Sequence, residues 1–173
     1  TLQIRIETCS ALALGSGEGW GAIIDSDIVW NQWGLPYFPA RRLKGLLRES
    51  ALEVVEMMSL AGQQDYDYSL IERLFGSETT PANLRIDNLV LQDQENILPW
   101  LEWACDPGVG LLSKQDIIES LSEVRSATAI DAETGTADDH SLRTIRVLKE
   151  GQVFCGEIEL DDDSQLVHDL LVM

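Results

Sequence analysis

The feature that most constrains the fold is an apolar stripe at helical spacing that follows Pro39. The stripe consists of Leu43, Leu46, Leu47, Ala51, Val54, Val55 and Met58. Residues three or four positions apart share one face of an α-helix, so the spacing predicts a helix that begins after Pro39 and ends near Gly62. Such a helix is stable only when other elements cover its apolar face, and a chain of 173 residues can supply them. We therefore expect one globular domain built around this helix.

The other periodic segments alternate between the patterns of strands and helices. Strands are expected over residues 2–8, 83–92, 142–148 and 153–160, and further helices over 65–75, 113–123 and 164–173. The short polar turn at 149–152 predicts that the last two strands form a β-hairpin, and the polar segment 125–140 predicts an extended loop. This order indicates an α+β ferredoxin-like (RRM-like) fold, with helices on one face of an antiparallel sheet and loop insertions that include a thumb-like β-hairpin region.

Composition narrows the class of protein. Apolar residues make up 45% of the chain and charged residues 24%, which are values of a folded globular protein. No segment approaches the roughly 18 consecutive apolar residues of a membrane helix, and no basic and apolar leader opens the chain, so we expect a cytoplasmic protein. A Ser-His-Asp order, a nucleotide-binding P-loop and CxxC spacing are all missing from the sequence, which argues against hydrolases, nucleotide-binding proteins and zinc proteins.

The charge of the predicted helix is reversed at its start. The net charge of the chain is -18, yet four cations fall within eight residues: Arg41, Arg42, Lys44 and Arg48. The N-terminal end of a helix carries partial positive charge, so cations there cost about a few tenths of a kcal/mol each unless an anion is bound. RNA phosphate is one such anion, and the spacing of Arg41, Lys44 and Arg48 predicts a single cationic stripe. The alternative is that these cations are solvated and pair with Glu49, Glu53 or another acidic segment.

Three segments carry a family resemblance. Gly34-Leu-Pro-Tyr-Phe-Pro-Ala-Arg-Arg-Leu-Lys-Gly-Leu-Leu-Arg48 resembles the signature of the RAMP superfamily of CRISPR type III effector subunits, in which a Pro-Tyr-Ile-Pro stretch leads into Leu-Lys-Gly. The glycine-rich loop 15–21 with the following residues 25–29 is similar to the family segment that carries an RNA-cleaving aspartate. Residues 129–137 and 150–156 resemble its thumb loop and the following hairpin. The two arginines before Leu-Lys-Gly are more similar to the type III-D-like branch.

The resemblance implies an RNA-binding subunit that stacks along a guide RNA, with guide RNA, target RNA and other subunits of a CRISPR effector as partners. The RNA-binding positions that it implies are Gly17, Gly19, Arg41, Arg42, Lys44, Gly45, Arg48, Arg125, Ile130 and Arg143. The family usually ends with a second helix, a glycine-rich loop and a last strand. The resemblance therefore implies that residues 1–173 form a single RAMP domain that is shortened at its C-terminus or belongs to a longer chain.

Two functions stay open on the sequence. If the subunit is an endoribonuclease, Asp25 is the candidate catalyst and ligand of a divalent Mg²⁺ or Mn²⁺, because a hard cation neutralises charge that develops on phosphate. Asp27 is the second candidate, since side chains two residues apart point the same way in an extended segment. The alternative is a non-catalytic, acidic capping subunit of the same kind of complex that works through protein contacts.

Overall fold

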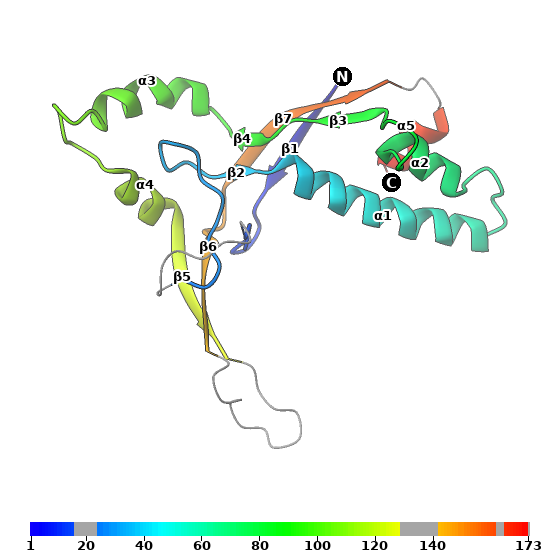
Figure 1. Ribbon diagram of the computed structural model, residues 1–173, viewed down its shortest axis with the longest axis horizontal. Coiled ribbons are helices and arrows are strands. Elements are labelled where there is room, and N and C mark those ends of the chain that lie inside the picture. Colours follow the sequence, from blue (N-terminus) through cyan, green and yellow to red (C-terminus); the bar gives the residue numbers. More distant parts are fainter. Residues whose placement is uncertain (16–23, 129–141, 162–164, 173) are drawn as a thin grey trace, which may run out of the picture. The chain divides into compact units, whose positions relative to one another are not determined.

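The computed structural model describes residues 1–15, 24–128, 142–161 and 165–172 (Figure 1). The strands are β1 (Leu2–Glu7), β2 (Tyr37–Phe38), β3 (Leu84–Ile86), β4 (Leu89–Leu91), β5 (Ser122–Ala127), β6 (Arg143–Leu148) and β7 (Val153–Leu160). The helices are α1 (Ala40–Leu60), α2 (Tyr68–Phe75), α3 (Gln94–Ala104), α4 (Lys114–Leu121) and α5 (Gln165–Val172). Helices thus occur together with antiparallel strand pairs, which confirms the expected α+β class.

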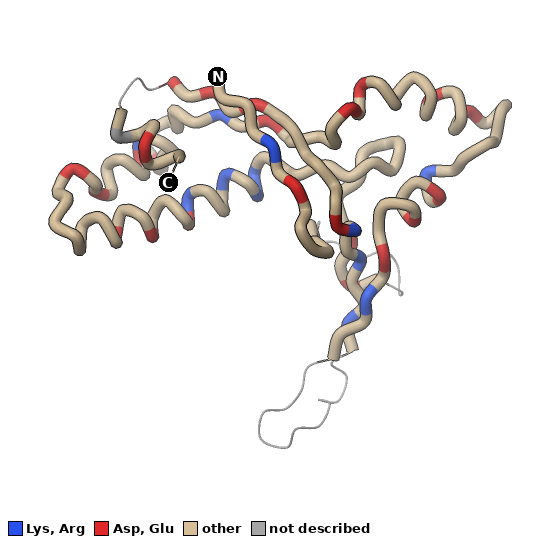
Figure 2. The backbone as a smooth tube through the Cα atoms, turned by 180° about the vertical axis from the view of Figure 1, so that it is seen from behind, with Lys and Arg blue, Asp and Glu red and all other residues tan. Residues whose placement is uncertain are grey.

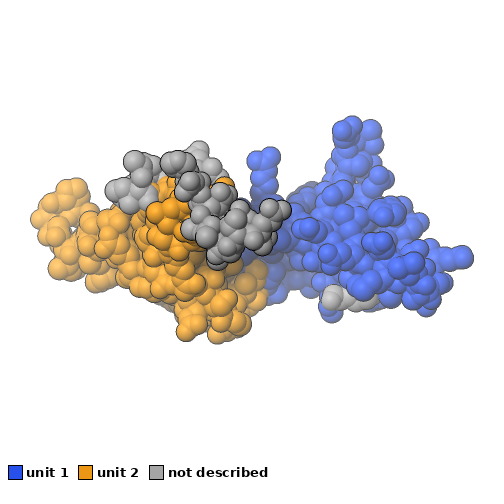
Figure 3. Space-filling model, turned by 90° about the horizontal axis from the view of Figure 1, so that it is seen from below, with its two compact units in different colours: residues 1–4, 38–89, 155–173 blue, residues 5–37, 90–154 orange. Residues whose placement is uncertain are grey.

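The strands form two sheets. One has the order β1-β7-β4-β2, with β3 also paired to β7, and the other contains β5 and β6. By its contacts the chain divides into two compact units (Figure 3). Unit 1 comprises residues 1–4, 38–89 and 155–173, and unit 2 comprises residues 5–37 and 90–154. Each unit is assembled from separate stretches of the chain, and the expectation of a single domain stays a prediction.

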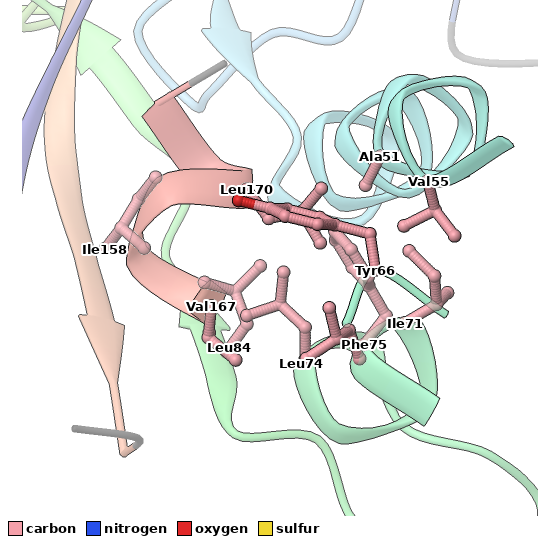
Figure 4. Packing of buried hydrophobic residues seen from close by; sticks show 11 residues of the cluster. Ala51, Val55, Tyr66, Ile71, Leu74, Phe75, Leu84, Ile158, Val167 and Leu170 are labelled. Carbon is pink, nitrogen blue, oxygen red and sulfur yellow. The ribbon is translucent and has the colours of Figure 1, made fainter. Parts of the chain in front are cut away.

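The core of unit 1 forms where α1, α2 and α5 pack on residues of β3 and β7 (Figure 4). Its buried members are Ala51, Val55, Tyr66, Leu70, Ile71, Leu74, Phe75, Leu84, Ile158, Val167 and Leu170. In Figure 4 the ring of Tyr66 extends toward Leu170 of α5. The apolar stripe of α1 is confirmed as core except at Leu46, which is 50% exposed. Because burying a large aliphatic side chain contributes about 1.5–3 kcal/mol, this cluster stabilises α1 far more than helix propensity does.

Unit 2 contains a hydrogen-bonded turn before β2 and a helix, α4, that is capped at its N-terminal end. Oδ1 of Asn31 accepts hydrogen bonds from the backbone N–H groups of Trp33 and Leu35, which closes the turn before β2. Gly34 in this turn has a φ of +84°, and a Cβ there would lie 2.7 Å from the carbonyl oxygen of Lys114, so glycine is required. The hydroxyl of Ser113 accepts from the N–H of Asp116, whose carboxylate accepts from the N–H of Ser113, so α4 begins with a capping box.

The segments β6 and β7 do not form the expected hairpin. β6 pairs with β5, whereas β7 belongs to the other sheet. Within residues 149–152, which join them, the N–H of Gly151 donates to the carbonyl oxygen of Thr8 at 2.7 Å. The turn therefore bonds to the end of β1 and leads the chain from one sheet into the other. The prediction that residues 142–148 and 153–160 pair as a hairpin is wrong.

The segment interpreted as a loop over 125–140 begins as a strand. In the antiparallel ladder of β5 and β6, Ser122 lies opposite Leu148 and Ala127 opposite Arg143. The loop interpretation is wrong for residues 125–127, while 129–141 lie outside the described residues. The strand expected over 83–92 is divided into β3 and β4, and α3 is a helix that the periodicity did not predict. No helix in the described part of the chain is long and apolar enough to cross a membrane.

Candidate nucleic-acid interface

The N-terminal end of α1 lacks the usual stabilising features. Pro39 is the N-cap and provides no side-chain hydrogen bond, and no acidic residue occurs in the first turn. The N–H of Ala40 is satisfied by Oδ1 of Asn88 at 2.9 Å. The N–H groups of Arg42 and Leu43 both donate to the carbonyl oxygen of Pro39, at 3.0 and 3.1 Å. No acidic side chain balances the partial positive charge of this helix end, which favours an anion there.

Three arginines lie in the first half of α1 and form what we call the α1 cation set: Arg41, Arg42 and Arg48. All three side chains are exposed, and none makes an ion pair within the parts of the chain that the structure describes. The predicted pairing of these cations with Glu49 or Glu53 is therefore not observed. Guanidinium groups without carboxylate partners keep all of their N–H donors for a ligand, and their fork geometry fits phosphate oxygens.

Lys44, which the sequence places on the same stripe, has a different role. It is partly buried, and its Nζ donates to the carbonyl oxygen of Leu84 at 3.2 Å. Lys44 thus ties α1 to β3 within unit 1. An ammonium group held in this way has fewer donors left for an anion than the arginines of the cation set have.

Gly45 leaves a smooth patch between the arginines. It lies in the first half of α1, is exposed, and a Cβ built on it would have no heavy atom within 4 Å. A glycine inside an exposed helix costs about 1 kcal/mol relative to alanine, and nothing within the described chain requires its small size. Close approach of another molecule to the backbone of α1 is a physical reason for this residue.

The two halves of α1 carry opposite charge (Figure 2). The cations occupy residues 41–48, whereas Glu49, Glu53 and Glu56 follow in the second half, and no basic residue lies in the last turn. A helix dipole favours the opposite arrangement at both ends. The charge distribution of α1 is therefore unfavourable for the isolated helix, and its cationic half is suited to a polyanion.

Asp25 is held against β6 in unit 2. Its N–H donates to the carbonyl oxygen of Thr144 at 2.8 Å, and its Oδ2 accepts from the N–H of Thr144 at 2.6 Å. The next residue, Ser26, bridges Ile145 in a parallel sense. The side chain of Asp25 is exposed, so its carboxylate is fixed in position while it stays accessible to a ligand.

Asp27, two residues further, is engaged in the interior of unit 2. Its Oδ1 lies 3.2 Å from Nε of Arg146 and accepts from the N–H of Ile28 at 2.7 Å and from Nε1 of Trp30 at 3.2 Å. The side chains of Arg146 and Asp27 are only 5% and 16% exposed. The guanidinium Nε points out of line for a hydrogen bond to Asp27, while Nη1 donates to the hydroxyl of Ser122 at 3.2 Å. Asp27 therefore compensates a buried positive charge.

The contacts of Asp25 and Asp27 determine whether the two carboxylates can bind the predicted divalent cation together. Asp25 offers one accessible carboxylate, and the carboxylate of Asp27 is already committed to Arg146 and two N–H donors. Among the described residues no group of three or more His, Cys, Asp or Glu side chains could hold a metal ion. Two carboxylates with this geometry do not fit a shared Mg²⁺ or Mn²⁺ site, because such ions bind through several oxygen ligands.

The remaining predicted RNA-binding residues are dispersed. Arg125 on β5 is exposed but paired with Glu123, with Nε to Oε1 at 2.6 Å. Arg143 is exposed at the start of β6, beside the peptide that binds Asp25, and makes no ion pair with another described residue. The other three predicted positions, Gly17, Gly19 and Ile130, lie outside the described residues.

Arg146 is a residue whose role the sequence analysis missed. The alternation of the segment 142–148 places Arg146 on the same strand face as Leu148, which is fully buried. A cation on the apolar face of a strand is the signal that could have predicted a buried ion pair and directed attention to an acidic partner.

A family model described as the RAMP superfamily matches residues 5–172. No curated protein matches the chain. Among solved structures, the cryo-EM structure of the type III-B Cmr-beta bound to cognate target RNA is similar with a TM-score of 0.63 and 11% identity, covering 98% of this chain and 86% of that chain. The apo state of type III-B Cmr-beta is similar with a TM-score of 0.61, the same identity and the same coverage. At this identity the likeness concerns the fold alone.

Proposed function

This chain belongs to the RAMP superfamily, and on that premise we propose that it is an RNA-binding subunit of a type III CRISPR effector complex that holds the backbone of a guide RNA with the first half of α1. The observation that carries the proposal is the α1 cation set: three exposed arginines in the first half of α1, without ion pairs to described residues, in a helix whose first turn lacks acids. Backbone contacts of this kind bind RNA without reading its sequence, which suits a subunit that must accept any guide.

The similar structures support the choice of partners. They are type III-B Cmr-beta complexes, and one contains cognate target RNA. We propose guide RNA, target RNA and other effector subunits as partners of this chain, and a ferredoxin-like classification for its antiparallel α+β fold. The finer assignment to a type III-D-like branch rests on Arg41 and Arg42, which precede Leu43 where the family motif begins.

The RNA-binding proposal is tested by neutralising the cation set in the variant Arg41→Gln, Arg42→Gln and Arg48→Gln. For a single strand, each phosphate contact contributes roughly 0.7 to the slope of log K against log salt concentration, so the loss of three contacts should reduce this slope by about 2. At 0.1 M salt this corresponds to about a hundredfold weaker binding of single-stranded RNA. Cations in the first turn oppose the helix dipole, so the free variant should be at least as stable as the wild type. Filter binding at several salt concentrations and urea denaturation measure the two effects.

Arg85→Gln is the matched control. Arg85 lies in the same unit and is exposed, but it pairs with Glu159 and Asp161. Its replacement changes the charge of a cation that is already compensated, so RNA affinity should stay the same. An unchanged salt slope in the triple variant, or an equal loss in the Arg85→Gln variant, would remove α1 as the RNA-binding element.

Cleavage of target RNA is the second part of the proposal and rests on Asp25. Its carboxylate is exposed and fixed by the Thr144 amide, whereas Asp27 is committed to Arg146. In an assembled complex, Asp25→Ala should abolish cleavage of target RNA and leave guide RNA binding intact. The assay is run with Mg²⁺, with Mn²⁺ and with a chelator, so that a requirement for a divalent cation is measured separately. Full cleavage by the Asp25→Ala complex would favour the non-catalytic alternative.

The non-catalytic alternative is a capping subunit that works through protein contacts. The observation that favours it is the lack of a metal-binding group among the described residues, together with the ion pair that commits the Asp27 carboxylate to Arg146. Under this alternative the wild-type complex binds target RNA but does not cut it under any of the three metal conditions.

A further inference from the structure

The segment 92–113 in unit 2 exposes a row of large apolar side chains. Ile97, Trp100 and Trp103 follow at intervals of three along α3 and are 40%, 49% and 54% exposed. Leu101 and Ala104, which are 4% and 0% exposed, anchor the helix. They lie four and seven residues after Ile97, so Ile97 stands at the border of the buried side while Trp100 and Trp103 turn further from it. Val109 and Leu111, in the turn after α3, are 42% and 57% exposed. We call these five exposed side chains the α3 apolar face.

The turn after α3 is held in place by its own hydrogen bonds. The N–H groups of Leu111 and Leu112 both donate to the carbonyl oxygen of Ala104, at 3.1 and 3.0 Å. Oδ1 of Asp106 accepts from the N–H of Gly108 at 2.7 Å. The apolar side chains are thus presented by a helix and an ordered turn. Half-exposed tryptophans on such a surface are unfavourable in water and are typical of protein interfaces.

The charge of this segment indicates which partner fits. Residues 92–113 contain Asp93, Glu95, Glu102 and Asp106, all of them exposed, and no lysine or arginine. A nucleic acid is disfavoured here because its phosphates would meet four carboxylates, against the single exposed Lys114 that follows the segment. Tryptophan faces beside carboxylates are instead complementary to arginine and lysine, which gain both ion pairing and cation–π contact.

We propose that the α3 apolar face is a docking surface for a basic protein partner, which inserts apolar side chains between Trp100 and Trp103 and places arginine or lysine against the surrounding acids. The surface belongs to unit 2 and its occupant is a protein, so it is separate from the RNA contact assigned to α1. The failure of one assignment leaves the other intact. In this arrangement Trp100 and Trp103 are the central contacts and the carboxylates form the polar rim.

The test uses the full chain and labelled peptides as probes. One peptide is an amphipathic helix of leucine and arginine, and a second replaces each arginine with glutamate. Binding is followed by fluorescence anisotropy for the wild type, for the variant Trp100→Ala with Trp103→Ala, and for the variant Glu95→Gln with Glu102→Gln. Met57→Ala with Leu60→Ala is the matched control, because these exposed apolar side chains lie on α1 beside acids and belong to unit 1, whose sequence contains no tryptophan.

The leucine–arginine peptide should bind at least tenfold more weakly to the tryptophan variant and less than twofold more weakly to the control. The Glu95→Gln and Glu102→Gln variant, which keeps every apolar contact, should bind more weakly and with less salt dependence. Equal binding of the wild type and the tryptophan variant would overturn the proposal, as would tighter binding of the leucine–glutamate peptide. It would also be overturned if the tryptophan variant lost affinity for single-stranded RNA or anionic vesicles, or if these tryptophans mediated self-association of the chain.

Discussion

Replacement of Asp27 by alanine should destabilise unit 2 strongly, because it leaves the guanidinium of Arg146 buried without its carboxylate. The side chain of Arg146 is 5% exposed, and that of Asp27 is 16% exposed at a distance of 3.2 Å. Removal of one partner from such a pair costs about 3–5 kcal/mol, since the remaining charge stays desolvated. The N–H of Ile28 and Nε1 of Trp30 lose their acceptor at the same time.

Urea denaturation followed by tryptophan fluorescence measures this loss, and Trp30 reports on the site directly because it donates to Asp27. For a chain of this size each kcal/mol corresponds to roughly 2–4 °C in Tm, so Tm should fall by about 6–20 °C. Asp25→Ala is the matched control: it removes the same charge two residues away, from an exposed side chain, and should cost less than about 1 kcal/mol.

The double variant Asp27→Leu with Arg146→Met separates charge from packing. When both charges are replaced by apolar groups of similar size, no desolvated ion remains, so most of the lost stability should return. The reasoning is refuted if Asp27→Ala costs less than about 1 kcal/mol. If that stable variant also loses RNA cleavage in the assembled complex, Asp27 is a functional residue and the assignment of catalysis to Asp25 alone is wrong.

Three other predictions follow from single positions. Gly45→Ala should raise the free energy of unfolding by about 1 kcal/mol, because the new methyl group has open space in the free chain. The same methyl group occupies the patch between the arginines, so the affinity for single-stranded RNA should fall several-fold. Urea denaturation and filter binding measure the two effects, and an unchanged affinity would exclude close approach of RNA at this position. Gly34→Ala should cost about 1–3 kcal/mol in urea denaturation, because its φ is +84° and the new Cβ would meet the carbonyl oxygen of Lys114; a smaller loss would mean that the turn relaxes. Hydrogen bonds from the side chain and then the backbone of Ser113 lower the pKa of Asp116, so its stabilising contribution is complete above the ordinary carboxyl range near pH 4 and disappears as pH falls through the lowered value. The Tm of Asp116→Asn should therefore approach that of the wild type as pH is reduced from 7 to 3, and a constant difference would contradict this account.

Elements with local signals were predictable from the sequence. The stripe from Leu43 to Met58 predicted α1 within two residues of its end at Leu60, and the helix expected over 113–123 matches α4 (Lys114–Leu121) within two residues at each end. These features depend on residues that are neighbours along the helix, so their energetics can be read from spacing.

Pairings between distant segments were not predictable in the same way. The turn at 149–152 is compatible with a hairpin, but Thr8, more than a hundred positions away, accepts its N–H groups. β5 is mostly polar and is a strand because β6 supplies its hydrogen bonds. The residues of the candidate site also fall into a predictable and an unpredictable group. The spacing of Arg41 and Arg48 predicted exposed cations, whereas the commitment of Lys44 to Leu84 and of Asp27 to Arg146 depends on contacts made only on folding.

The separation of positive and negative residues along α1 changes the meaning of the net charge of -18. The helix has 21 residues and is therefore roughly 32 Å long. At physiological ionic strength mobile ions attenuate a surface charge over about 8 Å, a small fraction of that length. A strand of RNA near Arg41 and Arg42 is thus almost insensitive to Glu53 and Glu56, and the overall sign of the protein is a poor guide to what its first helix attracts. The charges also orient the approaching RNA, since the acidic second half of α1 repels a polyanion while the arginines of the first half attract it.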